Sequence, residues 1–265
     1  MIASPRTERL AILLGAAAVV VGRALVFVWW EQAHFDADQA IVGLMAKHLI
    51  EGRAFPLFFY GQQYLLGVEA WLVVPALWLG GVSVASLKLP LVLMNVALVV
   101  GLILALERFA GLRPALAGLA SLFVILPPPG TASRLVQANG CNIEPFLYVL
   151  LIWLLRARPL WLGLVAGVGV LNREFTMYAV VALLAVELAQ GELWRGQRIR
   201  ALGLALLVAL GVWQAVQVLI PFASAQGPGT SFRDGSLTSH LAEVGRRFCW
   251  NEGQVIDRLA VLFTD

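Results

Sequence analysis

Two carboxylates stand directly after the first long apolar run of this chain. Asp36 and Asp38 follow the run 10–30 and open a stretch of mixed polarity, HFDADQAIVGLMAKHLIEGRAFPLFFYGQQY. A carboxylate in this setting can act as a general base that takes a proton from an acceptor hydroxyl. Together with a second carboxylate it can also hold a divalent cation. The acidic pair is therefore the first candidate for chemistry, and the divalent cation stays open.

The residues after the acids predict an amphipathic helix over 36–50. Apolar positions recur at helical spacing and form one stripe, which consists of Ile41, Leu44, Met45, His48 and Leu49. A carboxylate at the start of a helix is favoured by the free N–H groups there, and Gly52 is a typical stop. Since one cap needs only one acid, we expect either Asp36 or Asp38 to serve merely as the cap.

Polar residues elsewhere in the first two loops could join this pair. The first loop also carries Tyr60, Gln62 and Tyr64, and the second, PPPGTASRLVQANGCNIEPF, adds Arg134 and Glu144. A guanidinium pairs bidentately with phosphate oxygens, so Arg134 suits a phosphate ligand. The alternative is a surface arginine at a lipid headgroup.

A third polar feature is the turn Asn172-Arg173-Glu174 between two apolar runs. Charges in such a place are costly unless they face a polar cavity or each other. The alternative is that Arg173 and Glu174 are two solvated residues at a loop tip.

Composition identifies the setting of these residues as a membrane. Of 265 residues, 60% are hydrophobic and 13% charged, and the mean hydropathy is +0.83. A soluble domain carries about 25% charged residues. The net charge of +3 comes from arginines at segment ends, which does not fit a nucleic-acid-binding face. Two cysteines are too few for a disulfide scaffold, and P-loop, HExxH, GxSxG and CxxC motifs are absent from the sequence.

Because backbone groups in lipid must bond internally, the apolar runs are expected to be helices. Candidate spans are 10–30, 86–106, 113–127, 144–157, 159–172, 175–190 and 200–221. The predicted fold is all-α: a polytopic transmembrane helix bundle with interfacial helices in its first outer loop. We divide the chain into a transmembrane module, 1–221, and a polar outer segment, 222–265.

Arginines between the spans predict the orientation. They cluster near 6–9, 108–113, 156–158 and 195–200, and the positive-inside rule places all four clusters in the cytoplasm. The chain is then a multi-pass protein of the inner (plasma) membrane with a cytoplasmic N-terminus. The loops 31–85, 128–143 and 172–174 lie on the outer side of that membrane. This parity requires the apolar segment 66–82 to lie along the membrane; the alternative is an ordinary short span.

The first-loop residues resemble the GT-C superfamily of integral-membrane glycosyltransferases, the branch of protein O-mannosyltransferases and aminoarabinose transferases. The resemblance is carried by FDADQAIVGLMAKHLIEGRAFPLFFYGQQYLLGVEAW and the following GVSVASLKLP. Its specific part covers about 50 residues: an acidic pair, an Ala-rich helix that ends in Gly, a Tyr-Gly-Gln turn and a small-residue stretch before a lysine. Members are usually longer, so the chain is expected to be truncated.

The resemblance implies roles for individual residues. The general base falls on Asp38 with Asp36 as its acidic neighbour, the second-loop acid on Glu144, and the cation that faces the lipid phosphate on Arg173. The family often has Asp-Glu where this chain has Asp38-Gln39, which leaves the metal unknown. A polyprenyl-phosphate sugar donor and an acceptor hydroxyl outside the cytoplasmic membrane are implied as partners.

Another interpretation is a non-catalytic polytopic membrane protein, either a scaffold or a transporter fragment. A transporter would show Gly- or Pro-broken helices at matching positions of two halves, and the sequence has no inverted repeat. A scaffold would need no acids and bases that converge from separate loops.

Overall fold

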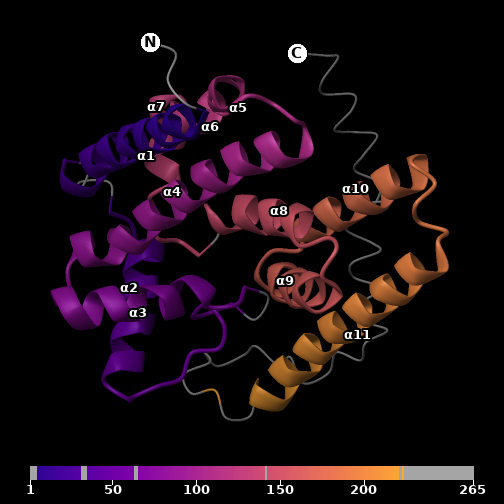
Figure 1. Ribbon diagram of the computed structural model, residues 1–265. Helices are drawn as coiled ribbons and strands as arrows, with labels where there is room; N and C mark the ends of the chain where they lie inside the picture. The colour runs from indigo at the N-terminus through magenta and orange to yellow at the C-terminus, as the bar shows by residue number, and fades with distance from the viewer. Residues whose placement is uncertain (1–4, 31–34, 63–64, 141, 221–222, 224–265) are drawn as a thin grey trace, which may run out of the picture. The chain divides into compact units, whose positions relative to one another are not determined.

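The computed structural model describes residues 5–30, 35–62, 65–140, 142–220 and 223 (Figure 1). The chain divides into two compact units, Met1–Gly227 and Pro228–Asp265, and the second lies outside the described residues. The described part is helical, as predicted, and its one β-type pairing is an isolated bridge between Phe58 and Leu66. The predicted boundary at residue 221 stays a prediction.

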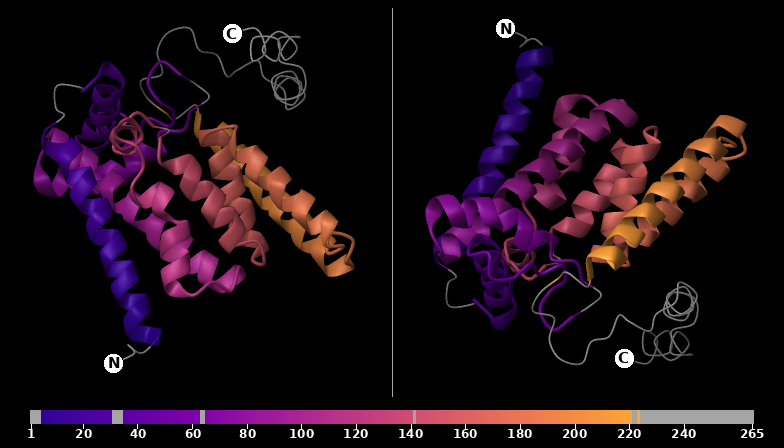
Figure 2. Two further views of the ribbon diagram at one scale, coloured as in Figure 1. Left: turned by 90° about the horizontal axis from the view of Figure 1, so that it is seen from above. Right: turned by 90° about the horizontal axis from the view of Figure 1, so that it is seen from below.

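Among the described residues, three helices are long and apolar enough to cross a membrane. They are α1 (Pro5–Trp29), α4 (Val84–Phe109) and α11 (Gly196–Leu219). Both views in Figure 2 place α1 and α11 at opposite edges of the first unit, with α4 between them. The prediction of a membrane protein with transmembrane helices is consistent with these three helices.

The remaining apolar helices are shorter. They are α3 (Val68–Gly80), α8 (Glu144–Leu154), α9 (Pro159–Asn172) and α10 (Thr176–Ala189). A single crossing of the hydrocarbon core takes about 20 helical residues. The bounds of α9 are those predicted, because Pro159 starts the helix at its first position and the turn at Asn172 ends it. That α8, α9 and α10 cross a membrane stays a prediction.

The first predicted outer loop contains the two helices expected there, α2 (Ala37–Ile50) and α3, which pack on each other. The predicted apolar stripe of α2 is wrong in part: the buried residues are Gln39, Val42, Met45 and Ala46, whereas Leu44 is exposed. The helix is apolar on more than one side, so periodicity does not specify which face packs against α3.

The predicted continuous helix over 113–127 is broken. The structure has α5 (Pro114–Ala120), α6 (Leu122–Ile125) and then α7 (Pro129–Arg134). The break is at Ser121, whose hydroxyl donates to the carbonyl oxygen of Ala117 at 2.8 Å and so competes with the backbone ladder. The prolines after α6 cannot donate backbone hydrogen bonds and prevent it from continuing.

Arg23 of α1 binds the end of α6. Its guanidinium donates to the carbonyl oxygens of Ile125 at 2.9 Å and Val124 at 3.2 Å. It also donates to Oδ1 of Asn95 on α4 at 3.1 Å, and the Asn95 amide donates to the carbonyl oxygen of Leu135 at 2.8 Å. These bonds satisfy backbone groups that a short helix leaves without partners. They join α1, α4 and the irregular segment after α6.

The closest helix–helix packing is between α9 and α11. A Cβ atom added at Gly163 would collide with the carbonyl oxygen of Ala205, and one at Gly167 would lie 3.0 Å from the Cα of Ala209. Two glycines four residues apart let two backbones approach closely, as small residues do in membrane helix pairs. The α9–α11 pair therefore depends on the absence of side chains at these two positions.

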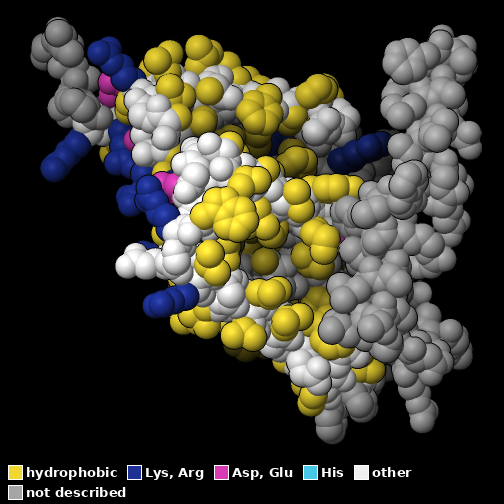
Figure 3. Space-filling model, turned by 90° about the vertical axis from the view of Figure 1, so that its right-hand side faces the viewer, with side chains coloured by type: hydrophobic (Ala, Val, Ile, Leu, Met, Phe, Trp, Pro, Cys, Tyr) yellow, Lys and Arg dark blue, Asp and Glu magenta, His cyan; other side chains and the backbone are white. Residues whose placement is uncertain are grey.

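The outside of the described unit is apolar over large areas. Figure 3 shows a face on which apolar side chains predominate and basic side chains gather along one edge. Exposed residues of α10 and α11 include Val181, Leu188, Leu206, Leu207 and Val218. Exposed apolar areas of this extent are typical of surfaces that contact lipid or another protein.

The arginine clusters expected on one side of the membrane meet at one end of the helices. Arg9 pairs with Glu107 at 3.0 Å, near the end of α4. The guanidinium of Arg156 lies 4.3 Å from the ring centroid of Phe109, and Arg198 donates to the carbonyl oxygen of Arg156 at 2.7 Å. We call this end the arginine end, and the start of α8 at Glu144 lies at the other end of that helix.

Candidate functional site

A pair of buried carboxyl groups lies where the predicted outer loops meet. The side chains of Glu69 and Glu144 lie within reach of each other, and the two residues are only 1% and 2% exposed. A buried carboxyl group is costly unless polar groups surround it. The backbone N–H groups of Gly140 and Ile143 also donate to Glu69 and Glu144, respectively. The pair thus consists of two buried carboxyl groups, each of which accepts one backbone hydrogen bond.

Three segments far apart in the sequence position this pair. The first is a turn in which the N–H of Phe59 donates to the carbonyl oxygen of Leu65 at 2.8 Å, shortly before Glu69 in the first turn of α3. The second is the loop before α8, where the N–H of Ala138 donates to Oε1 of Gln39. The third is the end of α9, where the Asn172 amide donates to the carbonyl oxygen of Leu66 at 2.9 Å. Loops one, two and three therefore converge.

A cation and a phenol complete the surroundings of the pair. The positive charge of Arg173 acts on Glu144, and both carboxyl groups act electrostatically on the hydroxyl of Tyr148. Arg173 is half-buried and directly follows the last residue of α9. Its backbone N–H donates to the carbonyl oxygen of Gly169 at 2.7 Å, which fixes the position of its backbone. The Tyr148 hydroxyl is buried and has no hydrogen-bond partner among the residues that the structure describes.

The two aspartates of the first loop have different environments. Asp36 is the N-cap of α2, and its Oδ1 accepts the N–H of Gln39 at 3.0 Å. Asp38 lies in the first turn of α2, is exposed, and forms no hydrogen bond or ion pair within the described ranges. One acid is thus occupied as the expected cap. Asp38 keeps its carboxylate available to solvent, next to Gln39, which contacts the second loop.

The other candidate residues are less close to the pair. Tyr60 is half-buried, and its hydroxyl lies 2.8 Å from Nδ1 of His48; burial raises the pKa of this phenol. Gln62 sits in the turn and donates its N–H to the carbonyl oxygen of Phe59. Arg134 is exposed at the end of α7. Tyr64 lies outside the described residues.

The residues around the pair do not provide a ligand set for a divalent cation. Ca²⁺ and Mg²⁺ prefer six or more oxygen ligands, several of them ionised. Here each of the two buried carboxyl groups accepts a backbone hydrogen bond, and the positive charge of Arg173 acts on Glu144. Within the described ranges, no three His, Cys, Asp or Glu residues lie together as a metal site requires. We derive no step through a metal ion.

Sequence reasoning counts Glu69 among the polar residues of the first loop without giving it a role of its own, and it does not single out Tyr148. The available signal is that Glu69 is a charged residue directly before an apolar run, where a carboxylate needs a partner. Tyr148 follows Glu144 by one helical turn, which places both side chains on one face of α8.

Comparison of the chain with protein-family models, with curated proteins and with solved structures gives no match. The chemistry of the site is therefore argued from its own residues.

Proposed function

We propose that this chain is a membrane glycosyltransferase that moves a sugar from a polyprenyl-phosphate donor to an acceptor hydroxyl. The observation that supports the proposal is the convergence of three loops on the Glu69–Glu144 pair with the charge of Arg173 beside it. Acids and a base from separate loops have no evident purpose in a scaffold. The apolar surroundings suit a donor with a long hydrocarbon tail.

In this proposal Asp38 takes the proton of the acceptor hydroxyl, because its carboxylate is exposed and not engaged as a cap. The acceptor oxygen then forms a bond to the anomeric carbon. The bond from that carbon to the phosphate oxygen breaks, and the polyprenyl phosphate leaves with the electron pair. Attack from the side opposite to the phosphate inverts the anomeric configuration.

Arg173 stabilises the charge that develops on the leaving phosphate. The Glu69–Glu144 pair is a positioning element in this proposal, because the charge of Arg173 acts on Glu144 where the first two loops meet. The arginine end lies at the other end of α8, which supports, by the positive-inside rule, a site on the outer side of the cytoplasmic membrane.

The test uses the purified full chain in nanodiscs and a photoreactive polyprenyl-phosphate sugar. We expect cross-links to peptides within 35–69, 138–148 and 171–176, and competition by polyprenyl phosphate but not by the uncharged polyprenol. Equal competition by the polyprenol, or cross-links confined to the outer faces of α10 and α11, would contradict the proposal.

A further inference from the structure

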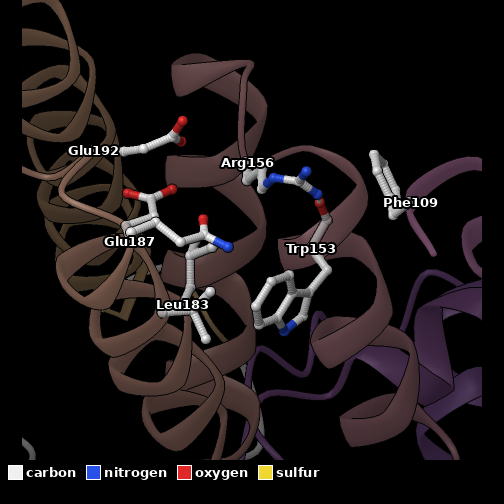
Figure 4. A pocket seen from close by; sticks show the side chains of 8 residues that line it. Phe109, Trp153, Arg156, Leu183, Glu187 and Glu192 are labelled. Atoms are coloured by element: carbon white, nitrogen blue, oxygen red, sulfur yellow. Dashed lines mark hydrogen bonds between the residues drawn. The ribbon is translucent and has the colours of Figure 1, made fainter.

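A cavity of about 210 Å³ lies at the arginine end, away from the carboxyl pair. Its walls come from the ends of α4, α8 and α10 and from the turn after α10 (Figure 4). Apolar side chains form part of the lining and charged or amide groups the rest: Phe109, Trp153, Leu183, Val186, Arg156, Glu187, Gln190 and Glu192. A cavity with an apolar part and a polar mouth suits an amphiphile.

The charges of the residues that line the cavity indicate which charge a ligand should carry. Glu187 is buried, and Arg198 compensates its negative charge, because both carboxylate oxygens accept hydrogen bonds from the Arg198 guanidinium. Glu192 is exposed and pairs with Arg195 at 3.6 Å. No carboxylate of the described residues lies within ion-pair distance of Arg156. The cavity therefore presents one uncompensated positive charge.

The guanidinium of Arg156 is held in place before any ligand arrives. It lies 4.3 Å from the ring centroid of Phe109, and one of its nitrogens donates to the carbonyl oxygen of Trp153 at 3.1 Å. Figure 4 shows the Arg156 guanidinium above the Trp153 side chain and pointing toward Phe109, with Glu187 and Glu192 on the other side of the picture. A fixed guanidinium binds a phosphate with little loss of side-chain freedom.

We propose that this cavity binds the phosphate group of a membrane phospholipid, with Arg156 as its contact and one acyl chain along the apolar wall. Two observations favour a lipid over a soluble phosphate. The cavity lies at the end of α4, one of the candidate spans, and it is lined in part by the exposed apolar residue Val186. This site is independent of the sugar-transfer proposal.

The test measures phosphatidylglycerol binding to the full chain in a phosphate-free detergent by native mass spectrometry. We expect Arg156→Gln to weaken binding about tenfold or more, since a charge-assisted hydrogen bond is lost. Arg158→Gln is the matched control, because Arg158 is exposed two residues further on and does not line the cavity. Val186→Trp keeps the charge but fills the cavity, and should weaken binding as well.

Two further measurements distinguish a bound phospholipid from a bound free phosphate or an uncharged lipid. Diacylglycerol with the same acyl chains should bind at least tenfold more weakly, and millimolar inorganic phosphate should not displace the lipid. Equal effects of Arg156→Gln and Arg158→Gln, or equal binding of diacylglycerol, would overturn the proposal. Displacement by inorganic phosphate would overturn the choice of a lipid. If Arg156→Gln does not fold, the Val186→Trp variant decides, and unchanged binding there contradicts the proposal.

Discussion

The carboxyl group of Glu69 lies within reach of that of Glu144, although the two residues belong to different loops and lie in the first turns of different helices. Nothing in the local sequence of either helix requires the other. The contact exists because the loop before α8 donates to Gln39 and Glu69, and so lies against the first loop. Contact between Glu69 and Glu144 therefore requires that the first two loops pack against each other. Variants of the two residues can test this contact.

A double-mutant cycle on this pair should show coupling. We expect Glu69→Ala and Glu144→Ala each to lower the free energy of unfolding by about 1–3 kcal/mol, because each leaves the other carboxyl group buried without its partner. The double variant should lose less than the sum of the two. Thermal unfolding in detergent provides the measurement, and strictly additive losses would show that the side chains do not interact.

Asp38→Asn should abolish sugar transfer by the active protein while expression stays normal. Asparagine keeps the size of aspartate but cannot accept the proton, and a general base contributes about 10²–10⁴-fold in rate. Asp36→Asn is the matched control, since the asparagine can still cap α2. Near-normal turnover of Asp38→Asn would remove Asp38 from the mechanism, and an equal loss in both variants would point to a structural effect.

Variants of Arg173 should separate donor binding from a structural role. Arg173→Lys keeps a point charge and should retain part of the activity, whereas Arg173→Gln should weaken donor binding and lower the rate together. Direct binding of the polyprenyl-phosphate donor is the decisive measurement. If the Gln variant binds the donor as tightly as the unchanged protein, then Arg173 does not contact the phosphate.

Gly163→Leu should disrupt the α9–α11 pair. A side chain there meets the backbone of Ala205, and overpacking of this kind costs about 1–3 kcal/mol. Gly203→Leu is the control, because a Cβ at Gly203 of α11 has no atom within 4 Å. Melting temperatures in detergent should fall for the first variant only. An equal shift in both would mean that hydrophobicity, not close approach, decides the effect.

The segment between α3 and α4 should be accessible from outside. Val82 is exposed there, so Val82→Cys, in a background without the two native cysteines, should react with an impermeant maleimide on intact cells. Arg158→Cys at the arginine end should react only after permeabilisation. Reaction of Val82→Cys only after permeabilisation would mean that α3 crosses the membrane after all.

The helices could be predicted from the sequence because the features that start and stop them are local. Pro159 and Asn172 bound α9, and Asp36 and Gly52 mark the ends of α2. The break at Ser121 could not be predicted, because a serine inside an apolar run usually continues the helix and here its hydroxyl binds the preceding turn instead.

Some residues of the candidate site could be predicted from the sequence, but their arrangement in space could not. Glu144 and Arg173 stand out by their charge next to apolar runs, and the structure brings the charge of Arg173 to Glu144. The partner of Glu144 could not be predicted, because it depends on backbone bonds of irregular loops, which leave no periodic trace in the sequence. The sequence pattern leaves open whether Asp36 or Asp38 caps α2, and the bond from the N–H of Gln39 identifies Asp36 as the cap.

The bonds from Arg23 to the end of α6 have a consequence for biosynthesis. The carbonyl groups of Val124 and Ile125 receive their donors from α1, which is synthesised before them. A polar backbone segment cannot settle in lipid without such donors. The donors for this segment are therefore already present in the chain when the segment is synthesised. A purely apolar helix in place of α1 would lack the Arg23 guanidinium and would leave these two carbonyl groups without those donors.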